Sequence, residues 1–105
     1  MSPYDIITNL VQKFILPKYP NLKLDSVDSM ILGNRRSFDV RIRTPRRLEP
    51  KIQMEIDSEI KNLFKMASLD TKERENFTRN NIVTWFKTPN SKEWTFHSSP
   101  GYEHY

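Results

Sequence analysis

A strict alternation of apolar and polar residues over positions 36–44 is the feature that most constrains the fold of this chain. The apolar members are Phe38, Val40 and Ile42, and the polar members between them are Ser37, Asp39, Arg41 and Arg43. A period of two is that of a β-strand with one face in a core and the other in water. The chain therefore has to build a sheet and to cover one face of it with other elements.

The segment before this strand predicts its hairpin partner. Residues 24–32 alternate imperfectly, and they are followed by a Gly-Asn pair, which is typical of tight turns. A two-residue loop would place Asp28 opposite Asp39, and like charges in that position are unfavourable. A four-residue loop over 33–36 places Asp28 opposite Arg41 instead, so we expect the longer loop.

The N-terminal segment predicts a helix. Ser2, Pro3 and Asp5 suit its start, because they supply a capping hydroxyl, a first-turn proline and an early acid. Pro17 ends the pattern. Between them, apolar residues recur three and four apart, at Ile6, Ile7, Leu10, Val11, Phe14 and Ile15. This stripe needs a partner surface.

Residues 50–66 support two interpretations. Ile52, Met54 and Ile56 alternate as in a strand, yet the whole segment also carries apolar residues at helical spacing. A proline in the first turn and several good helix formers favour a helix over 50–66. The alternative is a short strand over 51–56, with the helix starting after it.

The remaining segments complete the expected architecture. Residues 70–80 begin like a capping box and predict a polar helix. Residues 82–87, rich in β-branched and aromatic side chains, predict a strand, and residues 92–97 predict its hairpin partner, with Trp94 and Phe96 on one face.

We therefore expect an α+β fold. It contains an N-terminal helix, a β-hairpin, one or two helices and a C-terminal β-hairpin, packed as a single two-layer domain. The domain spans residues 1–97, and residues 98–105 form a C-terminal tail.

Composition excludes several classes of function. The chain of 105 residues has no cysteine, which excludes disulfide frameworks, thiolate zinc sites and cysteine nucleophiles. Two glycines, Gly33 and Gly101, are too few for the GxxxxGK or GxGxxG loops that bind phosphates. No stretch approaches the ~18 consecutive apolar residues of a membrane span, and no signal peptide pattern opens the chain. We expect a cytoplasmic, non-enzymatic protein with no cofactor and no membrane partner.

Charge is concentrated in one segment, Asn34–Arg47. The segment holds one acid, Asp39, and six arginines: Arg35, Arg36, Arg41, Arg43, Arg46 and Arg47. The eleven basic and twelve acidic side chains elsewhere nearly cancel, so this segment accounts for the formal net charge of +4. Arginine binds phosphates bidentately and stacks on bases. We predict that the six arginines bind DNA or RNA, mainly through backbone contacts.

Two other interpretations of the arginines stay open. They would equally suit an acidic protein surface or a self-complementary surface of a homo-oligomer. They would also suit a solvated strand face, in which they pair with Asp25, Asp28 or Glu49. The sequence contains no groove-reading motif, GXXG loop or aromatic pair of the RRM kind that would choose among these partners.

Two further groups of residues carry weaker hypotheses. Base stacking is one role for the aromatic residues Trp85, Phe86, Trp94, Phe96 and Tyr102, but large aromatic side chains in a small domain are more often core residues. His97, Glu103 and His104 lie near one another in the sequence, yet their spacing is not that of a recognised metal site. We therefore predict no metal site.

A nuclease is the remaining alternative. If residues 51–56 form a strand, the order of helix, three strands, helix and strand resembles the core of the PD-(D/E)XK nucleases. The resemblance implies that Asp39 and Glu55 coordinate Mg²⁺ at the scissile phosphate. It covers topology alone, because the lysine expected two positions after the acid is replaced by Asp57.

Overall fold

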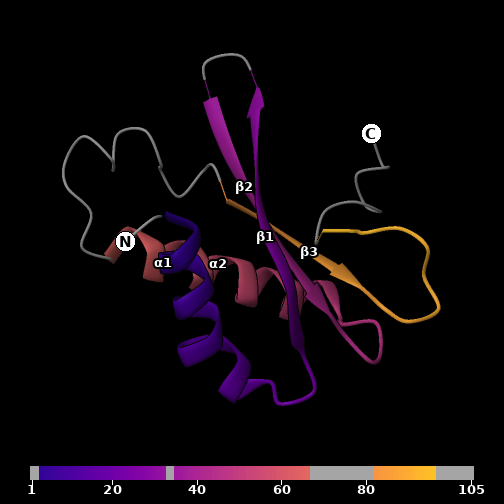
Figure 1. Ribbon diagram of the computed structural model, residues 1–105. Coiled ribbons are helices and arrows are strands. Elements are labelled where there is room, and N and C mark those ends of the chain that lie inside the picture. The colour runs from indigo at the N-terminus through magenta and orange to yellow at the C-terminus, as the bar shows by residue number, and fades with distance from the viewer. Residues whose placement is uncertain (1–2, 33–34, 67–81, 97–105) are drawn as a thin grey trace.

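The computed structural model describes residues 3–32, 35–66 and 82–96, and it has the expected α+β fold (Figure 1). The N-terminal helical segment runs through α1 (Pro3–Leu10), the π-helical turn η1 (Val11–Ile15) and the 3₁₀ turn η2 (Leu16–Lys18). It is followed by β1 (Lys23–Leu32), β2 (Arg35–Arg43), α2 (Pro50–Met66) and β3 (Ile82–Lys87). The three strands form one mixed sheet in the order β1-β2-β3, in which β2 is antiparallel to β1 and parallel to β3.

Both helices pack against the same face of this sheet. The alternating residues of β2 divide as predicted, since Phe38, Val40 and Ile42 have no exposed surface. They share one core cluster with residues from both helices and from β3. The other members are Ile7, Val11, Ile15, Leu22, Ile56, Ile60, Phe64, Ile82 and Phe86. The opposite face of the sheet, here called the outer face, therefore carries the polar residues of β2.

The N-terminal helix forms where it was predicted, but one residue of its stripe does not join the core. Ile7, Val11 and Ile15 are completely buried, whereas Phe14 is 49% exposed. The buried residues are spaced four apart along α1 and the π-helical turn that follows it. Because a π-turn has a wider spacing than an α-turn, the buried side of the helix follows this interval and Phe14 lies outside it.

The predicted register of the hairpin is wrong. Leu32 pairs with Arg35, so the loop has two residues, and Asp28 lies opposite Asp39. The two carboxylates tolerate this position because Arg41 binds Asp28 and approaches Asp39. A bulge between Leu24 and Ser26 then shifts the register by one residue.

Residues 50–66 form the helix α2 rather than a strand followed by a helix. Ile56, Ile60 and Phe64 face the core at helical spacing, and this burial decides between the two interpretations. Because α2 connects two parallel strands, β2, α2 and β3 form a βαβ unit.

The predicted C-terminal hairpin is reduced to one bridge. Phe86 and Thr95 exchange two backbone hydrogen bonds, with N···O distances of 2.7 Å and 3.0 Å. Trp94 and Phe96, on either side of Thr95, contact residues of the outer face, so the prediction that they share a face is confirmed.

The helix predicted over 70–80 and the tail predicted over 98–105 lie outside the described residues. In the part of the chain that is described, no helix has the length and apolar character needed to cross a bilayer.

Candidate functional site

The structure does not bring the six predicted arginines together at one place on β2. Arg35 and Arg36 begin the strand, beyond the part that pairs with β3, whereas Arg43 ends it. At the rise of a β-strand, the backbone positions of Arg35 and Arg43 are about 26 Å apart. The hairpin end that carries Arg35 projects past β3 in Figure 1. The side chains of Arg35 and Arg36 lie outside what the structure describes.

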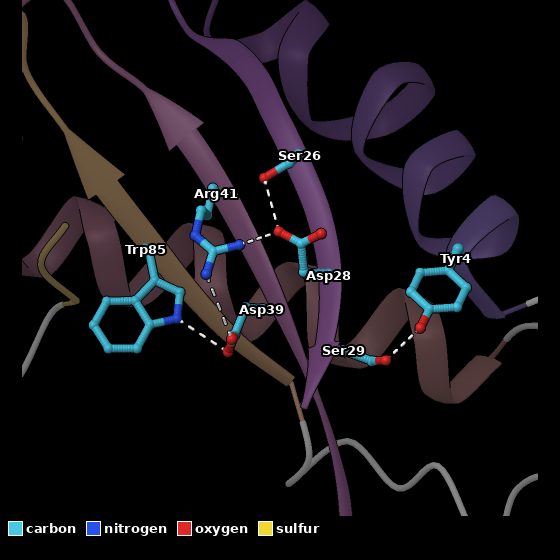
Figure 2. Close-up of polar contacts among 7 residues, drawn as sticks. All are labelled: Tyr4, Ser26, Asp28, Ser29, Asp39, Arg41 and Trp85. Atoms are coloured by element: carbon cyan, nitrogen blue, oxygen red, sulfur yellow. Dashed lines mark hydrogen bonds and ion pairs between the residues drawn. The ribbon is translucent and has the colours of Figure 1, made fainter. Parts of the chain in front are cut away.

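Arg41, in the middle of the outer face, is occupied by neighbouring carboxylates. Its Nη1 donates to Asp28, and its Nη2 lies 3.8 Å from Asp39 Oδ2 (Figure 2). On the other side, the indole Nε1 of Trp85 donates to Asp39 Oδ1 at 3.1 Å. For Arg41, this network matches one of the interpretations that the sequence left open, a solvated strand face on which the arginines pair with nearby acids. It stabilises the pairing of Asp28 with Asp39 rather than presenting a free cation.

A row of three cations crosses the opposite end of the sheet. In the strand pairing, Lys23 of β1 is the partner of Arg43, and Arg43 is in turn the partner of Lys87 in β3. Partner residues of neighbouring strands project from the same face, so the three side chains share the outer face. Like charges in directly opposed positions destabilise a sheet unless they are compensated.

Asp25 and Trp94 compensate part of this charge. Arg43 Nε donates to Asp25 Oδ1 at 2.6 Å, and this hydrogen bond holds the pKa of the Asp25 carboxyl below its ordinary value. The guanidinium of Arg43 lies 5.5 Å from the centre of the Trp94 ring, and Lys87 Nζ lies 5.7 Å from it. Both distances are in the range of cation–π attraction. The Arg43 side chain remains 52% exposed.

The loop between β2 and α2 brings two further arginines to this end. Arg46 and Arg47 are exposed, and Thr44 fixes the loop by donating its hydroxyl proton to the carbonyl of Arg46 at 2.6 Å. The two side chains line different hollows, on either side of Leu48. Arg46 shares a hollow with Lys23, and Arg47 shares another with Lys87.

Five cations therefore lie on the surface around the carboxyl ends of β2 and β3. We call it the strand-end surface, and it consists of Lys23, Arg43, Arg46, Arg47 and Lys87. Of these, only Arg43 has an ion pair among the described residues, with Asp25. Open α/β sheets bind ligands outside the carboxyl ends of parallel strands, which is where this surface lies.

The hollow shared by Arg47 and Lys87, here called the β3-side pocket, has a volume of about 510 Å³. It lies between the end of β3, the loop after β2 and the first turns of α2. Its lining residues are Thr44, Arg47, Leu48, Gln53, Phe86, Lys87, Thr88, Ser91, Glu93 and Thr95. The lining combines two cations with several hydroxyl groups and one acid.

Three aromatic residues that were expected mainly in the core lie on the outer face. Phe86 is 3% exposed and belongs to the core, but Trp85, Trp94 and Phe96 are only half-buried. The rings of Trp85 and Phe96 meet edge to face, with centroids 4.9 Å apart. The outer face therefore places aromatic rings beside cations, as Trp94 with Arg43 illustrates.

The structure does not assemble the metal pair that the nuclease resemblance implied. Residues 51–56 belong to a helix, so the third strand of that core is not formed there. Asp39 lies on the outer face beside Trp85, whereas Glu55 is exposed on α2, which packs against the other face. The described residues contain no cluster of three or more metal-binding side chains, and His97, Glu103 and His104 lie outside them.

Sequence reasoning missed Lys23 and Lys87 because both join the surface through strand pairing. Lys87 continues the outward alternation of Val83 and Trp85, so a parallel pairing with β2 would have revealed it. Lys23 reaches Arg43 only after the register shift at the bulge, for which the sequence carries no clear signal.

Comparisons of this chain with protein-family models, with curated proteins and with solved structures gave no match. The site therefore has to be interpreted from its own geometry.

Proposed function

We propose that this protein is a small, non-enzymatic domain that binds nucleic acid through the strand-end surface. The cations there are placed to contact phosphate groups, which supply most of the affinity in sequence-independent binding. The observation that carries the proposal is the row of Lys23, Arg43 and Lys87 across three strands.

The row supports a polyanionic partner because the protein only partly compensates it. One acid, Asp25, pairs with the central cation, while Arg46 and Arg47 add two more charges nearby. Placing five cations at one end of a small sheet is unfavourable without an anion. A nucleic-acid backbone supplies regularly spaced phosphates, and arginine is the side chain best suited to bind them bidentately.

The proposal differs from the sequence-based hypothesis in the role of Arg41. Its guanidinium binds Asp28 and lies next to Asp39. If Arg41 bound a phosphate, the free energy lost with these contacts would offset the free energy gained from the phosphate. Arg35 and Arg36 remain candidates for additional contacts by a long ligand, because they lie at the far end of β2.

The test compares two double variants that remove the same charge from different faces. Arg46→Gln with Arg47→Gln changes the strand-end surface, whereas Lys13→Gln with Lys65→Gln changes exposed positions on η1 and α2. The logarithm of the binding constant falls linearly with the logarithm of salt concentration, by about 0.7–0.9 per phosphate contact. We expect the arginine double variant to flatten this slope by roughly 1.4–1.8 and the lysine control to leave it unchanged.

Equal effects of the two double variants would place the interaction elsewhere. Failure to bind either DNA or RNA at low salt would exclude the proposal and leave an acidic protein or a second copy of the chain as the partner. Sedimentation of the protein alone then distinguishes a homo-oligomer from a monomer that needs a different protein.

A further inference from the structure

We propose that the nucleic acid is single-stranded, that Trp94 stacks one of its bases, and that the β3-side pocket takes a neighbouring phosphate. This inference rests on the proposed function, because it specifies which form of nucleic acid the strand-end surface binds. It follows from two cations, Arg43 and Lys87, that lie over the Trp94 ring, and from the pocket that Lys87 also lines.

Trp94 occupies the place at which a base would meet the protein. Its ring is half-buried on the outer face, with Arg43 at 5.5 Å and Lys87 at 5.7 Å from the ring centre. In the free protein the two cations interact with the aromatic ring. Both have long side chains that can turn toward phosphates, which would let a base take their position over the ring.

The pocket and the Trp94 ring share a neighbour, Lys87. Lys87 lines the pocket and its Nζ lies 5.7 Å from the centre of the Trp94 ring, while two backbone hydrogen bonds hold Thr95, the residue after Trp94, against Phe86. Arg47 and Lys87 supply the charge that a phosphate requires, and Thr88 adds a hydroxyl donor to the lining. A phosphate in the pocket and a base on Trp94 would belong to adjacent parts of one chain.

A single strand suits this arrangement better than a duplex. Bases in a duplex are stacked inside it and cannot reach a ring on a protein surface without being flipped out. Proteins that bind single strands combine a positively charged groove with aromatic side chains on which bases stack. Here Trp85 and Phe96 extend the aromatic surface beyond Trp94 on the same face of the sheet.

Substitution of Glu93 is a further test, because the inference predicts that removing this acid tightens binding of the single strand. This acid is exposed, lines the pocket and has no ion pair among the residues described. Its carboxylate repels a phosphate placed between Arg47 and Lys87. Glu93→Gln is therefore expected to tighten binding of a single strand about 2- to 5-fold at low salt, whereas a ligand that used this carboxylate would bind more weakly.

The experiment measures fluorescence anisotropy of the full chain with a labelled oligothymidine of about 15 nucleotides, and with a mixed-sequence duplex of the same length. We expect the single strand to bind at least 10-fold more tightly than the duplex. Trp94→Leu is expected to weaken binding of the single strand about 10-fold, with little effect on the duplex. Trp94→Phe keeps a stacking ring and should stay within about 3-fold of the wild type.

Matched controls separate stacking from folding and from general anion binding. Phe14→Leu removes another exposed aromatic ring, from the helical layer, and should leave binding of the single strand unchanged. Circular dichroism verifies the fold of each variant, and if Trp94→Leu does not fold, Trp94→Phe and Glu93→Gln still test the inference. Thymidine monophosphate and inorganic phosphate are added as competitors, and we expect neither to displace the oligonucleotide at millimolar concentration.

The other possible outcomes contradict either the single-strand inference or the proposed function, and the measurements distinguish the two cases. Equal affinity for duplex and single strand, with no effect of Trp94→Leu, would overturn this inference and leave nucleic-acid binding intact. Competition by the mononucleotide or by phosphate at micromolar concentration would identify a small-ligand site instead. Absence of binding to either nucleic acid would overturn the proposed function itself.

Discussion

Asp57 is the side chain that joins the helical layer to the edge of the sheet. Only 5% of it is exposed, and its Oδ1 accepts hydrogen bonds from the Thr84 backbone N–H at 3.2 Å and from the Thr84 hydroxyl at 2.7 Å. Its Oδ2 pairs with Lys61 at 2.7 Å. The Thr84 N–H belongs to β3, whose outer edge has no further strand among the described residues, so Asp57 satisfies a donor that the sheet leaves open.

We expect Asp57→Ala to lower the free energy of unfolding by about 3 kcal/mol, because it leaves buried donors of Thr84 without an acceptor. Thr84→Val removes one hydrogen bond and keeps the shape of the side chain, so its expected cost is about 1 kcal/mol. Urea denaturation of both variants measures the difference. Equal and small losses would show that the contact does not anchor α2 to β3.

The hydrogen bond between Arg43 and Asp25 makes the stability of the folded protein depend on pH in the acid range. The hydrogen bond from Arg43 lowers the pKa of the Asp25 carboxyl in the folded state. A group whose folded pKa lies below its unfolded value stabilises the fold above the unfolded pKa, and this contribution is lost as pH falls through the folded pKa. We expect Arg43→Gln to raise the pKa of Asp25 toward the ordinary aspartate value of 3.8, as measured by a carbon NMR titration.

The matching stability measurement uses Asp25→Asn. Its unfolding free energy should differ from that of the wild type above about pH 4, and the two should converge at lower pH. If the two unfolding free energies moved apart as the pH fell, the pKa of Asp25 would be raised in the folded state rather than lowered, which would contradict the role given to Arg43. The pair is largely open to solvent, so the difference is expected to shrink as salt is added.

At the level of the β1–β2 hairpin, Arg41 makes an otherwise unfavourable register acceptable. Asp28 and Asp39 are direct partners, and Arg41 lies between them in Figure 2. We expect Arg41→Ala to destabilise the protein by about 1–2 kcal/mol, because the two carboxylates then face each other. Thermal or urea unfolding measures this loss.

A second substitution distinguishes this electrostatic role from simple packing. Adding Asp28→Asn to Arg41→Ala should recover part of the lost stability, which a double-mutant cycle quantifies. An additive result would mean that Arg41 acts independently of Asp28. Neither variant should change the salt slope of nucleic-acid binding, because Arg41 lies outside the strand-end surface.

The elements were predictable where periodicity was strong. The alternation of Phe38, Val40 and Ile42 predicted β2 and its buried face, and the helical spacing in 50–66 predicted α2. The predicted register was wrong because it treated Asp28 and Asp39 as an isolated pair. Arg41 and Trp85 change the energy of that pair, and Trp85 comes from a strand whose parallel pairing depends on the tertiary fold.

The candidate site was predictable only as a segment rich in arginine. The sequence identified Arg43, Arg46 and Arg47, but the prediction grouped them in one site with Arg35 and Arg36, which lie at the other end of β2. It also assigned Trp94 mainly to packing, because an alternating strand does not reveal which of its faces meets the core when the opposing layer is unknown.

Over the whole molecule, the charge distribution relates stability to binding. The strand-end surface concentrates cations that repel one another in the free protein, and salt screens that repulsion. We therefore expect moderate salt to stabilise the free protein and to weaken its complex with nucleic acid at the same time. The two responses have opposite signs because the same cations are responsible for both.

Lys87→Gln tests this relation in one variant. Removing one end of the cation row should raise the unfolding free energy at low salt by a few tenths of a kcal/mol and reduce its dependence on salt. The same variant should bind a single strand more weakly, because Lys87 borders the β3-side pocket. Lys65→Gln on α2 carries the same loss of charge away from the row and serves as the control. A loss of stability of Lys87→Gln at low salt would contradict this expectation. It would mean that the cation–π contact of Lys87 with Trp94 outweighs the repulsion between Lys87 and Arg43. The row of cations would then be a structural feature rather than a binding surface.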